Sequence, residues 1–362
     1  MSTLAVAKTP TTVTPLPAHA GWIANGSYDG LFFVGSLMAG VVLTMIALAS
    51  PALGIPATIV AGIVFNNTHN LITGLFYFDR QNLAYYRKFP HYYFTMPVLL
   101  MVLSIAIFVY SPALGFTIHF FFTVWHVARQ SVGVQKLYLG RIRAGEFERK
   151  FDAALIYLAI VVLHVYAISK FHPLFATTAL SPADVDPRGT GLVAALVAAI
   201  ALVFTVRVLW LGLASKRVAW QRLGFGLTSI GMYAPYLIID QYQVAFMAGI
   251  LPHYVQYHGI YWLIGQNKYE DNPEYAGTVL GNLARDFRIW AVLLVMAATV
   301  MAVFRAPYFV AEHSASVLEL YRRPILVCLG FFYGIGWMHF YLDGLFFKFR
   351  YPEVRAAILR YL

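Results

Sequence analysis

Histidine is the residue type in this chain with the greatest capacity for chemistry. Of its eleven histidines, four fall in polar tails or loops, where a solvated imidazole is the simplest interpretation: His19, His91, His172 and His313. The others lie within long apolar segments, where a titratable side chain is costly and is a candidate for function: His69, His119, His126, His164, His253, His258 and His339. Neutral imidazole binds iron, copper and zinc, so these segments could contain a metal centre.

Four of these histidines stand at a matched distance from a basic residue at the end of their segment. Each precedes its arginine or lysine by nine to eleven residues: His69 and Arg80, His126 and Lys136, His258 and Lys268, His339 and Lys348. At the α-helical rise of 1.5 Å per residue, each imidazole lies roughly 13–17 Å from that rim. Four helices would thus bring histidine to one layer, which predicts that these residues are ligands of one metal site.

Amide side chains accompany two of these histidines at helical spacing. Asn66 precedes His69 by three residues, and Asn70 follows it by one. Gln130 follows His126 by four residues. Metal-bound imidazole usually donates its second ring N–H to a carboxylate, amide or carbonyl. We therefore expect these three amides to support the ligands. The simpler alternative for any one residue is a hydrogen bond that joins two helices.

Two charged residues are candidates for a catalytic role. Asp343 follows His339 by four residues, so the two side chains share a helical face. Asp343 could be a metal ligand or the carboxylate that orients His339. Arg129 projects from the His126 side of its helix, where it could pair with Asp343 or hold an anionic headgroup.

His253 and His258 are five residues apart, which is about 140° around a regular helix. They face differently unless Pro252 distorts the turn. Depth favours His258 as the ligand and leaves His253 as the second candidate.

Two more histidines are candidates for supporting roles. His119 precedes His126 by seven residues, about 10 Å along a helix, so it could serve a second ion, a proton path or packing. His164 has a similar depth and could be a further ligand or a satisfied histidine of the bundle interior.

The composition of the chain indicates that the elements that hold these residues are membrane helices. The chain has 362 residues, of which 60% are hydrophobic and 12% charged, about half the charged fraction of an average soluble domain. This composition excludes a water-soluble enzyme, a disordered protein and a fibrous repeat. With a net charge of +10, the basic residues of so apolar a chain belong at the rim of membrane helices rather than on a nucleic-acid surface. The single cysteine, Cys328, excludes an internal disulfide and a cysteine-based zinc or iron–sulfur site.

A helix needs about 20 apolar residues to cross a bilayer, and ten segments have this length: 31–50, 54–78, 92–110, 113–138, 153–171, 190–213, 223–240, 243–267, 288–306 and 325–347. We therefore predict an all-α, polytopic transmembrane bundle as a single domain over 26–362, after a disordered tail over 1–25. The longest loops are expected at 172–189, 268–287 and 307–324. Most of the 26 lysines and arginines fall on one side if the ten spans alternate, which predicts cytoplasmic termini in a bacterial-type inner membrane.

A histidine-rich site inside an apolar bundle suits oxidation of a lipophilic molecule, because the bundle keeps water from the reaction. We predict an oxidoreductase or oxygenase with one or two iron ions and a lipophilic small-molecule substrate. Its expected partners are the bilayer and an electron donor or further membrane subunits, with no nucleic acid. Two alternatives are a haem-binding electron carrier, with His69 and His126 as axial ligands, and a proton-coupled transporter with the histidines, Asp240 and Asp343 as a relay.

Single histidines scattered over many spans loosely resemble the Brp/Blh family of membrane-bound β-carotene dioxygenases. The resemblance rests on His69, on Trp125 with His126, on the stretch from His253 to His258, and on the stretch from His339 to Asp343. It implies histidine-bound iron and the oxidative cleavage of a carotene to retinal. Asn66 to Asn70 stand where the Pro-His-Gly type of motif of that family is expected. The clustered histidine boxes of fatty-acid desaturases and alkane hydroxylases are absent from the sequence.

Overall fold

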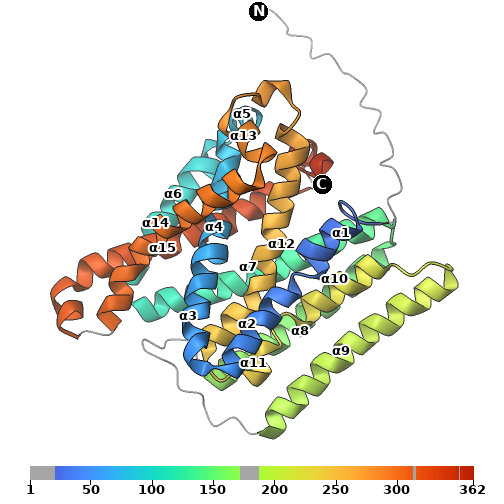
Figure 1. Ribbon diagram of the computed structural model, residues 1–362, viewed down its shortest axis with the longest axis horizontal. Helices are drawn as coiled ribbons and strands as arrows, with labels where there is room; N and C mark the ends of the chain where they lie inside the picture. Colours follow the sequence, from blue (N-terminus) through green and yellow to red (C-terminus); the bar gives the residue numbers. More distant parts are fainter. Residues whose placement is uncertain (1–20, 172–186, 313–314, 350) are drawn as a thin grey trace, which may run out of the picture.

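Long helices form most of the structure, a computed structural model that describes residues 21–171, 187–312, 315–349 and 351–362 (Figure 1). Every regular element in those ranges is helical, which confirms the all-α prediction. The predicted tail lies outside the described residues up to residue 20, as do residues 172–186 of the loop predicted over 172–189 and His19, His172 and His313.

The α-helices are α1 (Gly26–Asp29), α2 (Leu37–Ala49), α3 (Pro51–Ala61), α4 (Thr68–Ile72), α5 (Arg80–Tyr86), α6 (Met96–Tyr110), α7 (Pro112–Arg141), α8 (Glu146–Phe171), α9 (Pro187–Ala214), α10 (Trp220–Gly231), α11 (Pro235–Ile238), α12 (Tyr242–Tyr269), α13 (Val279–Arg285), α14 (Phe287–Glu312), α15 (Ala315–Phe346) and α16 (Pro352–Ala357). Three π-helical segments are η1 (Gly30–Val34), η2 (Gly62–Asn67) and η4 (His91–Thr95). Three 3₁₀ segments are η3 (Thr73–Phe78), η5 (Pro273–Tyr275) and η6 (Leu359–Tyr361).

Each of the ten predicted segments coincides with helical structure, but four of them contain more than one element. Segment 31–50 contains η1 and α2, segment 54–78 consists of α3, η2, α4 and η3 in succession, segment 92–110 consists of η4 and α6, and segment 223–240 contains α10 and α11. The expected loop over 307–324 is largely helical, because α14 continues through Pro307 and α15 begins at Ala315. The expected loop over 268–287 contains η5 and α13.

Five of the described helices are long and apolar enough to cross a membrane: His91–Tyr110, Glu146–Phe171, Arg188–Ala214, Phe287–Pro307 and Tyr321–Phe346. A sixth span results if Gly26–Val34, which comprises α1 and η1, acts as one with α2, which it meets at a bend of 43°. These elements are consistent with a membrane protein. The other predicted segments are either divided or, as in α7 and α12, rich in polar and histidine side chains.

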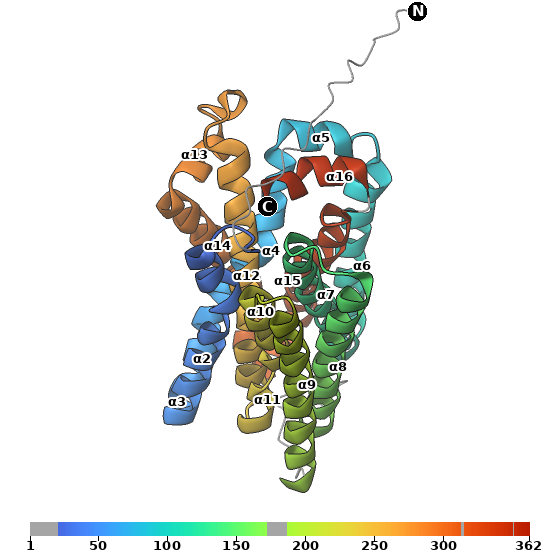
Figure 2. The same ribbon diagram turned by 90° about the vertical axis from the view of Figure 1, so that its right-hand side faces the viewer.

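α12 runs through the middle of the bundle and packs against α2, α3 and α13 (Figure 1). Most of its residues are buried. α9 lies at the periphery, packed on α8 and α10 (Figure 2). The short helices α5 and α16 lie together at one end of the bundle (Figure 2).

α6 and α15 approach each other very closely. A Cβ added at Gly330 would meet the Cα of Ile105 at 2.6 Å, and one at Gly334 would meet the Sδ of Met101 at 2.6 Å. Ser104 Oγ donates to the carbonyl of Gly330 over 2.8 Å. Glycine is therefore required on this face of α15, and the contact fixes α15 against its neighbour.

Candidate metal centre

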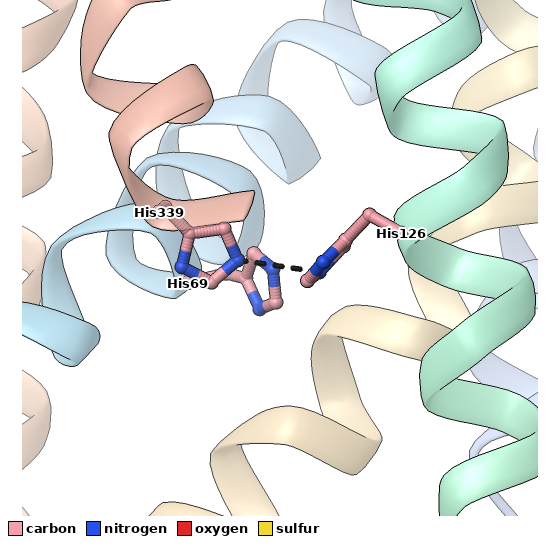
Figure 3. Close-up of side chains that lie close together, drawn as sticks. All are labelled: His69, His126 and His339. Atoms are coloured by element: carbon pink, nitrogen blue, oxygen red, sulfur yellow. Dashed lines mark hydrogen bonds between the residues drawn. The ribbon is translucent and has the colours of Figure 1, made fainter. Parts of the chain in front are cut away.

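Three buried histidines from helices that are far apart in sequence converge in the interior. His69 comes from α4, His126 from α7 and His339 from α15, and their rings point toward one another (Figure 3). One ring nitrogen from each lies within 4.8 Å of those of the other two. The structure therefore brings together three of the four histidines that the sequence places at one depth.

His253, from α12, completes a cluster of four imidazoles, which we call the histidine cluster (His69, His126, His253 and His339). The Nε2 atoms of His253 and His69 are 3.3 Å apart, and those of His339 and His126 are also 3.3 Å apart. The ring centroids of His126 and His253 are separated by 5.0 Å. All four side chains are buried.

The ring nitrogens of His69, His126 and His339, all within 4.8 Å of one another, are spaced as the ligands of one ion would be, and His253 adjoins them through His69. Imidazole nitrogens lie ~2.0–2.1 Å from a bound zinc, so two of them in a tetrahedral sphere are roughly 3.3 Å apart. Both Nε2 pairs of the histidine cluster have this separation. Buried imidazole nitrogens at this separation suit a transition-metal ion.

The structure places His253 at the cluster and His258 beside it, whereas depth alone favours His258. α12 continues as a regular helix through Pro252, so the two histidines face different neighbours. The Nε2 atom of His258 lies 2.9 Å from Thr68 Oγ1, and its ring packs against Phe65. Angular position, rather than depth, therefore decides which of the two joins the cluster.

A hydroxyl and a carboxylate support the cluster from one side. Thr73 Oγ1 lies 2.6 Å from Nδ1 of His339 and 3.5 Å from Oδ1 of Asp343. Asp343 Oδ2 lies 3.9 Å from Nε2 of both His126 and His339, and Tyr257 donates to Oδ1 of Asp343. If Thr73 donates to Asp343 and accepts from Nδ1–H of His339, the Nε2 lone pair of His339 is free to bind a metal.

The contacts of Asp343 are compatible with either of the roles expected from the sequence. Its Oδ2 lies 3.9 Å from two ring nitrogens of the cluster, and its Oδ1 is connected to His339 through Thr73. Its other partner, Tyr257, hydrogen-bonds to Tyr261 over 2.9 Å. This chain of hydroxyls holds the carboxylate in place.

Arg129 and Gln130 lie near the cluster but contact other groups. The Arg129 guanidinium stands 5.8 Å from the ring centroid of Trp125. Gln130 Nε2 donates to the backbone carbonyl of His253 over 3.3 Å. Gln130 therefore supports the cluster through the backbone of α12 rather than through an imidazole.

The other predicted supporting residues lie elsewhere. Asn66 donates to Asn67 over 3.4 Å, and Asn70 faces Gly336 of α15. The ring of His119 packs against Tyr333 at 4.5 Å. His164 contacts the carbonyl of Ile160 through Nδ1 at 2.7 Å and packs against Tyr233 and Tyr236, as expected of a histidine in the bundle interior.

The backbone around His69 is irregular on both sides. The π-helix η2 ends directly before α4, and the 3₁₀ segment η3 begins directly after α4. The hydroxyl of Thr68 donates to the backbone carbonyls of Val64 and Phe65, at 2.5 and 3.1 Å. Such π-helical turns are frequent at functional sites because they rotate the side chains that follow.

Thr73 and Tyr257 are site residues that the sequence patterns considered above do not identify. Thr73 follows His69 by four residues, and Tyr257 follows His253 by four. Each therefore shares a helical face with a histidine of the cluster. A search for polar residues at this spacing from every buried histidine would have found both.

A cavity of about 1060 Å³ opens beside the cluster. His126, Asp343 and Tyr257 line it, together with Arg129 and Gln130. This volume is slightly above the ~300–1,000 Å³ that is typical of small-molecule sites. The candidate metal centre therefore adjoins a space large enough for an organic substrate.

Comparison of the chain with protein-family models, with curated proteins and with solved structures finds no match.

Proposed function

We propose that this protein is a membrane-embedded oxidoreductase that holds a metal ion, most suitably iron, in the histidine cluster and oxidises a lipophilic substrate. The observation that carries the proposal is the meeting of four buried imidazoles and one carboxylate beside a cavity of about 1060 Å³. Imidazole with carboxylate is a ligand set typical of non-haem iron, and an iron ion so held would supply dioxygen activation. The Brp/Blh resemblance supports the same chemistry.

The residues of the chain have distinct roles in this proposal. His69, His126, His253 and His339 would bind the ion through their inward nitrogens. Thr73 fixes the tautomer of His339, and Tyr257 holds Asp343 toward the cluster. The buried aromatic rings of Tyr254 and Tyr257, which pack against His69 at 4.9 and 4.1 Å, keep water from the reacting atoms.

The close packing of the imidazoles favours a bare ion over haem. An axial pair must face each other across a macrocycle, but the four rings contact one another directly, with His69 and His339 centroids 4.3 Å apart. A relay of protons through the histidines would use nitrogen pairs at 3.3 Å, but it would not need one ring nitrogen from each of three histidines within 4.8 Å of one another.

The proposal includes the finer membrane arrangement. α7, α12 and the divided segments would complete a ten-span bundle in a bacterial-type inner membrane, with both termini in the cytoplasm. Their polar faces then meet in the interior, where the histidine cluster lies, while the apolar helices face lipid. An electron donor or a further membrane subunit would supply the reducing equivalents.

The test is metal analysis and an optical spectrum of the detergent-purified protein. We expect stoichiometric non-haem iron in the wild type and its loss in His126→Ala, His253→Ala and His339→Ala. His164→Ala, which removes a buried imidazole away from the cluster, is the matched control and should retain the metal. Full metal content in all three cluster variants, or none in the wild type, would refute the proposal. A Soret band would show that the protein binds haem instead.

A further inference from the structure

The cavity beside the histidine cluster has a polar and an apolar end. It follows α7, and the lining residues from that helix include, in order, Phe122, Trp125, His126, Arg129, Gly133, Lys136, Gly140 and Arg141. At 1.5 Å per residue, this stretch is roughly 28 Å long. His126 therefore lies between the aromatic residues at the start of the stretch and the basic residues that begin one turn later with Arg129.

The basic end holds an unusual concentration of positive charge. Arg129, Lys136, Lys348 and Arg355 line the cavity, and none of them forms an ion pair with a carboxylate among the described residues. Among the side chains that line the cavity, the one carboxylate is that of Asp343, which is held by Tyr257 and Thr73 beside the histidine cluster. Arg129, Lys136 and Arg355 are exposed and Lys348 is half-buried, whereas the buried Arg222 is paired with Asp152.

The opposite end is apolar and aromatic. Leu100, Phe122, Trp337 and Phe340 line it, and Trp337 is buried against Phe122 with ring centroids 5.6 Å apart. Between the two ends, a Cβ added at Gly133 would meet no atom within 4 Å, so the wall there is backbone. A molecule in this cavity would meet cations at one end, the histidine cluster along its length and hydrocarbon at the other end.

From this polarity we infer that the cavity binds a single-chain amphiphile with an anionic head, the head among Arg129, Lys136, Lys348 and Arg355 and the chain past His126 toward Trp337. This inference deepens the proposed function and rests on it for the reaction, but the binding itself does not require the metal. It implies that the reacting atoms belong to the chain of the substrate and not to its head. Lys136 is ten residues from His126, about 15 Å along α7.

The test uses photoreactive sixteen-carbon probes that differ only in the head: a carboxylate, a phosphate and an alcohol. Labelling of the full-length protein, with and without a metal chelator, is measured against probe concentration, and labelled peptides are mapped by mass spectrometry. We expect an anionic probe to half-saturate at a concentration roughly three- to tenfold lower than the alcohol, as two weak exposed ion pairs would produce. The labels should map to the stretches around Phe122 and Trp337, and the better of the two anionic heads identifies the head chemistry.

Two variants make the test specific. Arg129→Gln/Lys136→Gln should abolish the preference for the anionic probes, whereas Lys216→Gln/Arg217→Gln, which removes two exposed charges outside the cavity, should leave it unchanged. Gly133→Phe should reduce labelling by all three probes, and the open space at Gly133 lets the variant fold. Equal labelling by the alcohol, unaffected by the first double variant, would overturn the inference. Absence of metal from the wild type would refute the proposed function without altering these binding results.

Discussion

Thr73 is the smallest side chain on which the geometry of the histidine cluster depends. Its hydroxyl is placed between Nδ1 of His339 and the carboxylate of Asp343, at 2.6 and 3.5 Å, and lies 2.7 Å from the hydroxyl of Tyr257. One group thus connects three helical segments, η3, α12 and α15. Groups that orient metal ligands in this way commonly affect metal affinity as strongly as some ligands do.

We expect Thr73→Val to lower metal affinity by ~10–100-fold, because valine keeps the shape of threonine but cannot orient His339. The measurement is competition with a chelator of known affinity on the purified protein. Thr299→Val is the control, since Thr299 is exposed on α14 and bonds only to the carbonyl of Val295 over 2.8 Å. Equal affinity in the two variants would show that Thr73 has no role in binding.

At this scale the sequence predicts residue types better than partners. His69, His126 and His339 are found from depth alone, because the rise of a helix is constant. Which of His253 and His258 faces them depends on the rotation of α12, and the pairing of Thr73 with His339 joins residues on different helices. The rotation of a helix about its axis depends on how it packs, which the sequence alone does not give. For this reason the sequence predicts Asn66 and Asn70 beside the metal ligands, where the structure has Thr73 instead.

Among the elements, the end of α12 is held by one buried ion pair. Lys268 pairs with Asp79, whose carboxylate also accepts from Tyr269 over 2.8 Å and from Tyr275 over 3.0 Å. Asp79 is at the same time the N-cap of α5, where it accepts from the backbone N–H of Gln81 over 2.8 Å. Both side chains of the pair are almost fully buried. α5, α12 and η5 are therefore joined at a single carboxylate.

We expect Lys268→Met to destabilise the fold by about 3–5 kcal/mol, because it leaves the buried Asp79 without its countercharge. Thermal unfolding in detergent measures the effect. Lys150→Met breaks the exposed pair with Glu146 and should cost at most about 1 kcal/mol. A melting temperature for Lys268→Met as close to wild type as that of the control would contradict the prediction.

The same pair makes stability depend on pH in the acid range. Burial alone would raise the pKa of Asp79, but the Lys268 ammonium and the hydrogen bonds that Asp79 accepts hold the pKa below its usual value of 3.8. A carboxyl whose pKa is lower in the folded state stabilises the fold above its unfolded pKa. That contribution should be lost as the pH falls below 3.8, and Lys268→Met should lose less stability over that interval.

The sequence predicts where helices occur but not where they break. All ten predicted segments are helical, because apolar length is a property of composition. The π-helix before His69 and the 3₁₀ segment after it are not visible in the pattern, since single turns of this kind depend on tertiary contacts such as that of Thr68 with His258. At Pro307 the sequence predicts the start of a loop, but the helix does not end there, and this proline lies inside α14.

For the whole molecule, the ten-span arrangement predicts which loops face which side of the membrane. In a Cys328→Ser background, which removes the one native cysteine, we expect Gln241→Cys to react with a membrane-impermeant maleimide on intact cells. Ser215→Cys should react only after lysis. Both positions are exposed, so accessibility within the fold is matched. Reaction of both cysteines from the same side would show that α10 and α11 do not together cross the membrane.

The four helices of the histidine cluster are spread along almost the whole chain, from α4 to α15, and this spacing has a consequence for biosynthesis. Polypeptide synthesis proceeds at ~5–20 residues per second, so the ribosome needs on the order of tens of seconds to pass from His69 to His339. At the end of that interval three of the imidazoles have been made, but His339 and Asp343 are still missing. In the proposed function the complete ligand set would therefore arise only when α15 docks on α6 through Gly330 and Gly334, and loading with metal would be a late event in the maturation of the protein.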